Sequence, residues 1–393
     1  MVEWKSIGEI SSNVFAGGTP STKHEEYYDG DIPWIRSGEI DFNVITKAER
    51  NITTAGYKNS SAKLIRKGSV VMAMTGATVA KSAIVDFETT ANQSVCAIET
   101  VESIVNYKFV FYSLAKDYFK IRSSAQGALT SLNLAMIKQL QIPIPSLSEQ
   151  QRIVSILDTF TSSISNLKQQ IEERRKQYEY ERDLLLDLEG KEGVEMKKLG
   201  EVCEIKNGYT PSTKKPEFWE NGSIPWFTLE DIRKNGRILS DAIKHITPTG
   251  VKKSGLFPQN SIIVSTTATI GEYALITRDF LCNQQISCIS VKEATRGKLL
   301  PKYLYYLSNS IGNWCKKNVN GGGSLLIVST SKLNNLFIPL PPLSTQSRIV
   351  SILDTFEQSI SNLEEQLAMR EKQYEYYRNQ LLTFEGEEER GKT

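Results

Sequence analysis

The sequence is poor in the residues that build zinc and redox centres. It has two histidines, His24 and His245, and five cysteines, none of which lies in a CxxC pair. Protein zinc sites usually combine closely spaced cysteines and histidines, so this composition argues against a zinc centre. The odd number of cysteines and their wide spacing predict reduced thiols, as is usual for a cytoplasmic protein.

Long apolar runs and an excess of one charge are also missing. No segment approaches the roughly 18–20 apolar residues of a membrane-spanning helix, and residues 1–5 lack the apolar region of a signal peptide. The 47 basic and 45 acidic residues leave a net charge of +2, which excludes a histone-like polycation but not a local basic face. The composition, with 40% hydrophobic residues over 393 positions, predicts a globular cytoplasmic protein of two or three domains.

Known catalytic motifs are absent from the sequence. There is no GxxxxGK[ST] phosphate-binding loop, and there is no Asn/Asp-Pro-Pro-aromatic run of the kind expected in a nucleobase amino-methyltransferase. Neither histidine is next to a candidate nucleophile, and the adjacent carboxylates at 25–26 and 172–173 are typical of solvated surfaces. We therefore expect no catalysis by this chain alone.

The chain is a tandem repeat. The nine residues 152–160, RIVSILDTF, recur without a change at 348–356. Shorter matches precede them in the same order: Thr-Pro-Ser-Thr at 19–22 and 210–213, Ile-Pro-Trp at 32–34 and 224–226, and Asn-Gln at 92–93 and 283–284. The offsets run from 191 to 196, so two copies of a module of about 190 residues follow one another, with small differences in loop length.

The second part of each copy has the pattern of a coiled coil. Apolar and aromatic residues alternate steps of four and three from Ile153 to Leu188, and again from Ile349 to Phe384. This spacing predicts a long helix of about 60 Å that packs along a narrow seam. Arg174 and Arg370 interrupt the seam at matching positions. They either extend out of the seam or form a polar layer that fixes the register.

The first part of each copy has the pattern of an α+β domain. Short β-rich runs such as 69–74 and 261–266 lie between turn residues, and an aromatic helical segment follows at 107–121 and 301–316. We expect the aromatic residues of these segments to belong to the core rather than to stack on bases. They include Tyr112, Phe119, Tyr305 and Tyr306.

These motifs and their order resemble the specificity subunit of a type I restriction–modification enzyme. The resemblance rests on residues 145–153 (PSLSEQQRI) and 342–349 (PLSTQSRI), and on the Gly-x-Thr-Pro-Ser and Ile-Pro-Trp turns. It covers essentially the whole chain, with Ser347 in place of the Gln151 of the first copy as a minor departure. It implies two α+β target recognition domains, residues 1–145 and 191–341, each followed by a long spacer helix, residues 146–190 and 342–387. The two helices are expected to pack as an antiparallel coiled coil with pseudo-twofold symmetry.

The resemblance also implies a function. Each domain would read one half of a gapped, bipartite site in double-stranded DNA, and the helices would set the spacing and dock two methyltransferase subunits. Two restriction subunits would complete the assembly, and S-adenosylmethionine, ATP and Mg²⁺ would bind to these partners, with no cofactor in this chain. The partners would methylate adenine or cleave DNA with ATP. Two alternatives are a scaffold that joins two protein-binding domains and a standalone nuclease or methyltransferase, for which the sequence has no motif.

Comparison of the copies separates supporting residues from candidate DNA contacts. Residues that both copies share, such as Trp34/Trp226 and Asn92/Asn283, are expected to hold turns and cores. If the half-sites differ, base contacts should lie where the copies differ, for example at Arg36, which aligns with Thr228. Arginine is suited to contacts with guanine, whereas threonine and lysine in loops often contact phosphates. The candidates in the first domain are Lys23, Arg36, Thr75, Thr78, Lys81 and Gln126. Those in the second domain are Lys214, Lys215, Thr228, Thr267, Thr269, Gln285 and Asn320.

Overall fold

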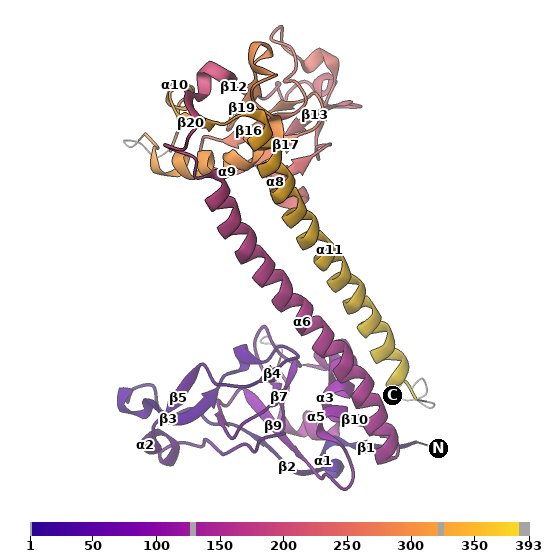
Figure 1. The fold of residues 1–393 in the computed structure, drawn as a ribbon. Helices are drawn as coiled ribbons and strands as arrows, with labels where there is room; N and C mark the ends of the chain where they lie inside the picture. Colours follow the sequence, from indigo (N-terminus) through magenta and orange to yellow (C-terminus); the bar gives the residue numbers. More distant parts are fainter. Residues whose placement is uncertain (1, 126–130, 321–325, 385–393) are drawn as a thin grey trace. The chain divides into compact units, whose positions relative to one another are not determined.

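The structure is a computed structural model that describes residues 2–125, 131–320 and 326–384 (Figure 1). The chain divides into two compact units, of which unit 1 comprises Met1–Gln169 and Glu364–Thr393 and unit 2 comprises Gln170–Leu363. Each unit contains one α+β domain and parts of two long helices. No helix of the described residues is long and apolar enough to cross a membrane.

The domain of unit 1 is built on three small sheets. The five-stranded sheet has the order β2-β9-β6-β7-β4, with the β4–β7 pair parallel and the other pairs antiparallel. A three-stranded sheet has the order β5-β3-β8, and β1 pairs with β10. The strands are β1 (Glu3–Ser6), β2 (Ser11–Ala16), β3 (Tyr28–Ile35), β4 (Val44–Ile45), β5 (Arg50–Ile52), β6 (Val70–Ala73), β7 (Ser82–Val85), β8 (Thr90–Ala91), β9 (Val95–Thr100) and β10 (Gln141–Ile144).

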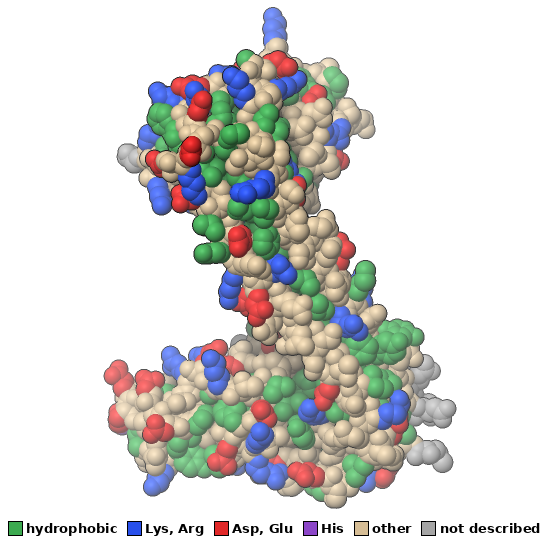
Figure 2. All heavy atoms as spheres, in the orientation of Figure 1, with side chains coloured by type: hydrophobic (Ala, Val, Ile, Leu, Met, Phe, Trp, Pro, Cys, Tyr) green, Lys and Arg blue, Asp and Glu red, His purple; other side chains and the backbone are tan. Residues whose placement is uncertain are grey.

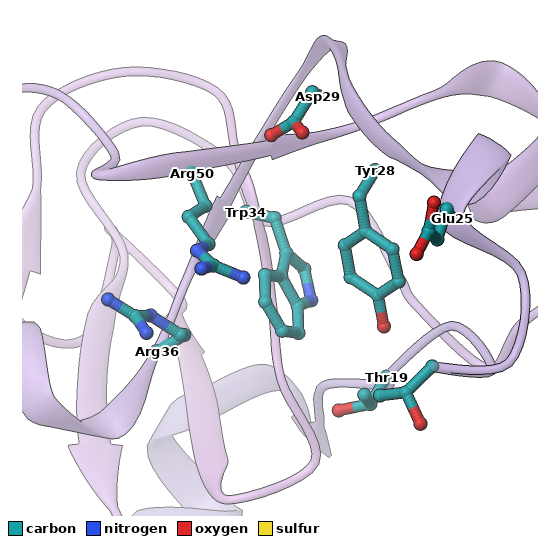
Figure 3. A pocket seen from close by; sticks show the side chains of 8 residues that line it. Thr19, Glu25, Tyr28, Asp29, Trp34, Arg36 and Arg50 are labelled. Carbon is teal, nitrogen blue, oxygen red and sulfur yellow. The ribbon is translucent and has the colours of Figure 1, made fainter.

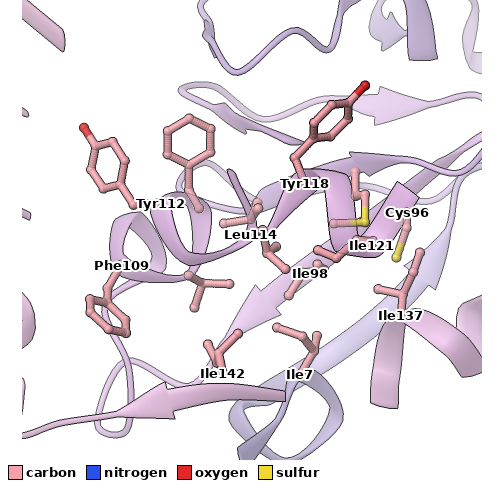
Figure 4. Packing of buried hydrophobic residues seen from close by; sticks show 14 of the residues in the cluster. Ile7, Cys96, Ile98, Phe109, Tyr112, Leu114, Tyr118, Ile121, Ile137 and Ile142 are labelled. Atoms are coloured by element: carbon pink, nitrogen blue, oxygen red, sulfur yellow. The ribbon is translucent and has the colours of Figure 1, made fainter. Parts of the chain in front are cut away.

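Both faces of the five-stranded sheet are buried. Along β6, Val70 and Met72 belong to a core beneath helix α3 (Tyr107–Lys116), whereas Val71 and Ala73 belong to a second core on the opposite face. Side chains alternate between the two faces of a strand, so burial of both faces accounts for the uninterrupted apolar run at 70–74. Figure 4 shows Leu114 and Ile121 packed over Ile98 of β9 in the first of these cores.

The helices of the α+β domain of unit 1 are short. They are α1 (Ile7–Ile10), α2 (Thr54–Lys58), α3 (Tyr107–Lys116), α4 (Tyr118–Ser124), α5 (Leu134–Gln139) and the 3₁₀ helices η1 (Glu25–Tyr27) and η2 (Ser37–Glu39). The single helix expected over 107–121 is thus divided at Asp117. Tyr112 is buried as predicted, but the prediction for Phe119 was wrong, because its side chain is 80% exposed. The break restarts the helical phase, so that Tyr118 and Ile121 face the core and Phe119 faces outward.

The domain of unit 2 repeats this topology. Its sheets have the orders β12-β19-β16-β17-β14, β15-β13-β18 and β11-β20. Tyr305 and Tyr306 of its aromatic helix α9 are buried as predicted. The strands are β11 (Glu195–Lys198), β12 (Cys203–Asn207), β13 (Ile224–Phe227), β14 (Ile238–Leu239), β15 (His245–Ile246), β16 (Ser261–Ser265), β17 (Tyr273–Ile276), β18 (Leu281–Cys282), β19 (Ile286–Val291) and β20 (Phe337–Leu340). The helices are α7 (Leu199–Val202), α8 (Leu229–Asn235), α9 (Pro301–Lys317), α10 (Thr330–Asn334) and the 3₁₀ helices η3 (Pro216–Phe218), η4 (Pro248–Gly250) and η5 (Glu293–Thr295).

The long helices α6 (Leu147–Leu186) and α11 (Leu343–Leu381) pack against each other in opposite directions. In unit 1, the rings of Phe160 and Tyr377 lie 5.3 Å apart, and Lys168, further along α6, forms an ion pair of 3.0 Å with Glu371, which is earlier on α11. The predicted antiparallel coiled coil is therefore confirmed. Residue 387, the expected end of the second spacer helix, lies outside the described residues.

The two seam arginines stack on aromatic rings of the other helix. The Arg370 guanidinium lies 5.6 Å from the Phe160 ring in unit 1, and the Arg174 guanidinium lies 5.9 Å from the Phe356 ring in unit 2. Arg370 and Phe356 are the counterparts of Arg174 and Phe160 at the repeat offset of 196. The internal repeat therefore relates the two contacts. Neither of the two expected arrangements describes this geometry fully, because each arginine stays in the seam as a cation over a π face.

The repeated segment RIVSILDTF attaches each long helix to its own domain. Asp158 accepts hydrogen bonds from Lys108 (2.6 Å) and from the Tyr112 hydroxyl (2.7 Å). Its counterpart Asp354 accepts a hydrogen bond from the Tyr306 hydroxyl and lies 3.1 Å from Lys302. Burial raises the pKa of the Tyr112 hydroxyl, with a smaller contribution from Asp158, so the phenol stays protonated and donates. These contacts account for the aspartate that both copies have at this position.

Candidate nucleic-acid interface

Four turns of unit 1 are held together by hydrogen bonds and form what we call loop cluster 1, residues 17–22, 34–41, 74–81 and 91–95. The backbone N–H of Gly17 donates to Val95 (2.9 Å), and the Trp34 indole N–H donates to the carbonyl of Gly18 (3.0 Å). A Cβ on Gly17 would lie 2.3 Å from the Ala91 carbonyl oxygen. Glycine therefore permits the close approach of these turns.

Unit 2 contains the same arrangement, loop cluster 2, residues 208–213, 226–235, 265–272 and 282–286. The Gly208 N–H donates to Ile286 (2.9 Å), and the Trp226 indole donates to the carbonyl of Tyr209 (2.9 Å). The Asn283 side-chain oxygen caps the Gln285 N–H (3.0 Å), as that of Asn92 caps the Ser94 N–H (3.2 Å). The prediction that residues common to both copies support turns is confirmed for these positions.

A buried carboxylate organises the segment that follows the central strand of each three-stranded sheet. In unit 1, Glu39 accepts hydrogen bonds from the backbone N–H groups of Arg36 (2.7 Å) and Glu49 (3.0 Å). In unit 2, Asp231 accepts hydrogen bonds from the N–H groups of Thr228 (2.7 Å) and Ile243 (2.6 Å). Both carboxylates therefore fix the backbone at the position where the copies differ, Arg36 in one and Thr228 in the other.

Three predicted residues of the first domain lie close together in loop cluster 1. Arg36 donates to Glu49 (2.6 Å), Thr78 donates to the carbonyl of Ser37 (2.9 Å), and Lys81 donates to Asp41 (2.6 Å). Thr75 belongs to the same β6–β7 loop and is half-buried. Lys23 is exposed in the turn before η1, and Gln126 lies outside the described residues.

A pocket of about 390 Å³ opens beside Trp34 (Figure 3). In this view Arg36 and Arg50 lie on one side of the indole, and Tyr28 and Glu25 lie on the other. The remaining lining residues are Thr19, Thr22 and Asp29. Two guanidinium groups and two carboxylates around aromatic rings offer donors and acceptors of the kind that read base edges.

The predicted residues of the second domain divide into two groups. Thr267 and Asn320 each form an antiparallel β-bridge with Ile327, and the N–H of Thr266 donates to the carbonyl of Gln285 (2.9 Å). The structure therefore brings Thr267, Gln285 and Asn320 together. Thr228 caps α8, and Thr269 is exposed at the tip of the β16–β17 loop. Lys214 and Lys215 are apart from this group, in an exposed turn before η3.

Sequence reasoning missed several residues of the loop clusters. They are Glu39, Asp41, Asp231 and Arg233. Arg50 of β5, which lines the pocket beside Trp34, was also missed. A signal was present, since positions 39 and 41 align with 231 and 233 at the offset of 192 that relates Trp34 to Trp226. Glu39 and Asp231 preserve a carboxylate at this offset, whereas Asp41 and Arg233 reverse the charge.

All five cysteines are free and buried, and burial raises the pKa of the Cys96 thiol to about 12. Among the residues that the structure describes, no group of three or more His, Cys, Asp or Glu side chains could hold a metal ion. On the face shown in Figure 2, basic and acidic side chains are interspersed over both domains.

Comparison with known proteins identifies the family. The model of the type I restriction modification DNA specificity domain matches residues 1–174 and 191–369. The EcoR124I/EcoR124II specificity subunit of Escherichia coli is 32% identical over 409 aligned positions, which cover 98% of this chain and 94% of that protein. The EcoprrI specificity subunit of Escherichia coli is 44% identical over 210 positions, and this match spans about half of each protein, 51% and 52%.

Solved structures show the same fold. A chain from a structural study of complex assembly in the type I R-M system superimposes with a TM-score of 0.66 and 20% identity, covering 97% of both chains. The paired domains, the antiparallel helices and the family match agree with one another. The chain therefore belongs to the family of type I restriction–modification DNA specificity subunits, and it is a non-catalytic DNA-recognition component rather than an enzyme.

Proposed function

We propose that each α+β domain reads one half of a gapped, bipartite site in double-stranded DNA. The helices α6 and α11 set the separation of the half-sites and dock two methyltransferase subunits. These partners methylate adenine or, with two restriction subunits, cleave DNA with ATP, and S-adenosylmethionine, ATP and Mg²⁺ bind to the partners. The domain boundaries that we propose are 1–145, 146–190, 191–341 and 342–387.

One observation supports two different half-sites more than any other. Loop clusters 1 and 2 have the same turns, the same tryptophan hydrogen bond and a buried carboxylate at the same position. The side chains that these turns display differ, with Arg36 in place of Thr228 and Lys81 in place of Glu272. Two domains that read unlike sequences require a shared backbone frame with different side chains. The frame positions the loops, and side-chain contacts with base edges give the sequence specificity.

The candidate DNA contacts remain those that the sequence suggested. Arg36, in the pocket beside Trp34, is suited to a bidentate contact with guanine. The threonines and lysines of the loops, together with Gln285 and Asn320, would contact bases or phosphates. The net charge of +2 favours modest binding to phosphates by this chain alone. Closure of the partners around DNA would then supply the remaining affinity.

Equivalent exposed side chains on the long helices support two equivalent protein partners. Tyr180 of α6 and Tyr376 of α11 are 68% and 60% exposed, and Ile156 and Ile352 are half-buried. Matching patches of this kind fit two copies of one partner. Saturating co-purification should give two methyltransferase subunits per chain, and a stoichiometry of one would contradict this assignment.

Sequencing of adenine methylation in cells with and without the gene tests the proposal. We expect a gapped motif of two unlike half-sites to be methylated only when the gene is present. Deletion of the gene should remove this motif and leave other methylation unchanged. A methylation pattern that does not depend on the gene would refute the proposal and would favour a scaffold without DNA readout.

A further inference from the structure

Each domain contains an ion pair between its hairpin loop and the segment that follows its central strand, and the two pairs have opposite polarity. In unit 1, Lys81 of the β6–β7 loop lies 2.6 Å from Asp41. In unit 2, Glu272 of the β16–β17 loop lies 2.7 Å from Arg233 of α8. Because Asp41 aligns with Arg233 and Lys81 with Glu272, the same two places are joined with the charges exchanged.

The backbone presents the two loop residues in the same way. Lys81 follows Ala80, which has a φ of +68°, and Glu272 follows Gly271, which has a φ of +90°. The carbonyl of Lys81 accepts the Ala73 N–H (2.9 Å), and the carbonyl of Glu272 accepts the Ser265 N–H (2.8 Å). The positive φ and the matching backbone hydrogen bond in both loops indicate one turn geometry, which is uncommon for a residue other than glycine such as Ala80.

We infer that Asp41–Lys81 and Arg233–Glu272 are positioning pairs that set the relative placement of the two loops through which each domain reads DNA. This inference rests on the proposed function. The pair in unit 1 holds the segment that begins at Arg36 against the loop that carries Thr75 and Thr78. The pair in unit 2 holds the segment that begins at Thr228 against the loop that carries Thr267 and Thr269.

The exchange of charges argues against a direct phosphate contact as the main role of Lys81. A phosphate contact needs a cation at that position, yet the second domain has a glutamate there. Both domains instead preserve the attraction between the two elements. On this inference, Lys81 acts as a positioning residue rather than as a direct contact to phosphate.

The two copies supply the substitutions for a charge-exchange experiment. Lys81→Glu and Asp41→Arg each place like charges together in unit 1, and the double variant converts this pair into that of unit 2. Glu272→Lys, Arg233→Asp and their double variant do the reverse. Each variant of the full chain is isolated with its co-purifying subunits and titrated with DNA that carries both half-sites, or one intact and one scrambled half-site, at several salt concentrations.

We expect each single reversal in unit 1 to weaken specific binding about five- to tenfold, through its own half-site alone. The double variant should return to within about twofold of the wild type, since paired charges couple non-additively. The slope of log affinity against log salt should remain unchanged in the double variant. The variants of unit 2 should behave in the same way at the other half-site.

Two outcomes would overturn the inference. If Lys81→Glu weakened binding to every sequence, lowered the salt slope by about one and was not rescued by Asp41→Arg, Lys81 would be a phosphate contact. If neither single reversal changed specific binding, the pairs would position nothing that reads DNA. Failure of the wild-type chain to prefer its methylation motif would instead refute the proposed function itself.

Discussion

The side-chain oxygen of Gln150 accepts a hydrogen bond of 2.8 Å from the backbone N–H of Asn106, at the point where α6 meets its domain. The Gln150 amide also donates to the carbonyls of Ile104 (3.2 Å) and Pro145 (2.9 Å), and the residue is completely buried. Gln346 makes the equivalent bonds in unit 2. One buried amide thus joins the start of each long helix to the globular domain before it.

Replacement of this glutamine should loosen the attachment of the helix. We expect Gln150→Ala to lower the free energy of unfolding by about 2–4 kcal/mol, because the partners of the amide lose their hydrogen bonds while buried. The midpoint of urea unfolding of the full chain measures the effect. The matched control is Ser155→Ala on the exposed side of α6, which should change stability by less than about 0.5 kcal/mol. Equal effects of the two substitutions would contradict this role.

A close contact between two glycines fixes the reading loop of unit 2. A Cβ on Gly312 of α9 would lie 2.4 Å from the carbonyl oxygen of Gly271. Alanine normally stabilises a helix by about 1 kcal/mol relative to glycine, but here Gly312→Ala should displace the loop that carries Thr267 and Thr269. We expect weaker binding at the second half-site and unchanged binding at the first. Gly297→Ala is the control, because its Cβ would meet nothing within 4 Å.

Arg36 should determine specificity in the first domain alone. We expect Arg36→Ala to cost about 1–3 kcal/mol in binding at one half-site and to relax the preference for one base there. Competition binding against a panel of single-base changes measures this. Glu49→Gln removes the carboxylate that pairs with Arg36 but leaves the guanidinium, and should preserve the preference. Equal loss on unrelated sequences would identify Arg36 as a phosphate contact or a structural residue.

The buried thiols should make the protein sensitive to alkali. Burial raises the pKa of Cys96, Cys203 and Cys288 from 9.0 to about 12. Above pH 9 the unfolded chain therefore loses thiol protons that the folded chain retains, so the stabilisation present below pH 9 declines as the pH rises toward 12. Each thiol should lower the free energy of unfolding by about 1.4 kcal/mol per pH unit in this window.

Urea unfolding at pH 8, 9 and 10 measures this dependence. Cys96→Ala removes one of the five buried thiols, so its pH slope should be smaller than that of the wild type even if its stability at pH 8 is lower. An identical slope in the variant would contradict the assignment of the effect to this thiol.

The repeat and the helices were predictable because both depend on local or self-similar sequence. The heptad steps placed the seam from Ile153 onward, and the shared Pro-Ser and Pro-Leu-Ser segments indicated where α6 and α11 begin. The division of the helix at Asp117 was not predictable from periodicity, since it shifts the phase by only a few residues. Phe119 was consequently assigned to the wrong face.

The site was predictable only in outline. Comparison of the copies indicated Arg36 and Lys81 as positions that differ, but it did not show which carboxylates lie beside them. Such partners come from loops that are distant along the chain: Glu49 lies 13 residues beyond Arg36, and Asp41 lies 40 residues before Lys81. Pairing of this kind depends on tertiary contacts, and one sequence compared with itself contains little information about them.

The exchanged ion pairs have a consequence for how such a protein changes over generations. A charge-reversing substitution at position 41 or 81 leaves two like charges face to face, so the partner position must also reverse its charge before the loop is held again. Among related chains, these two positions should therefore covary, with acid–base and base–acid combinations both common and matched charges rare. The same rule should hold for positions 233 and 272. The placement of the loops would then persist through linked double changes, while the side chains that read the bases change independently of the pairs.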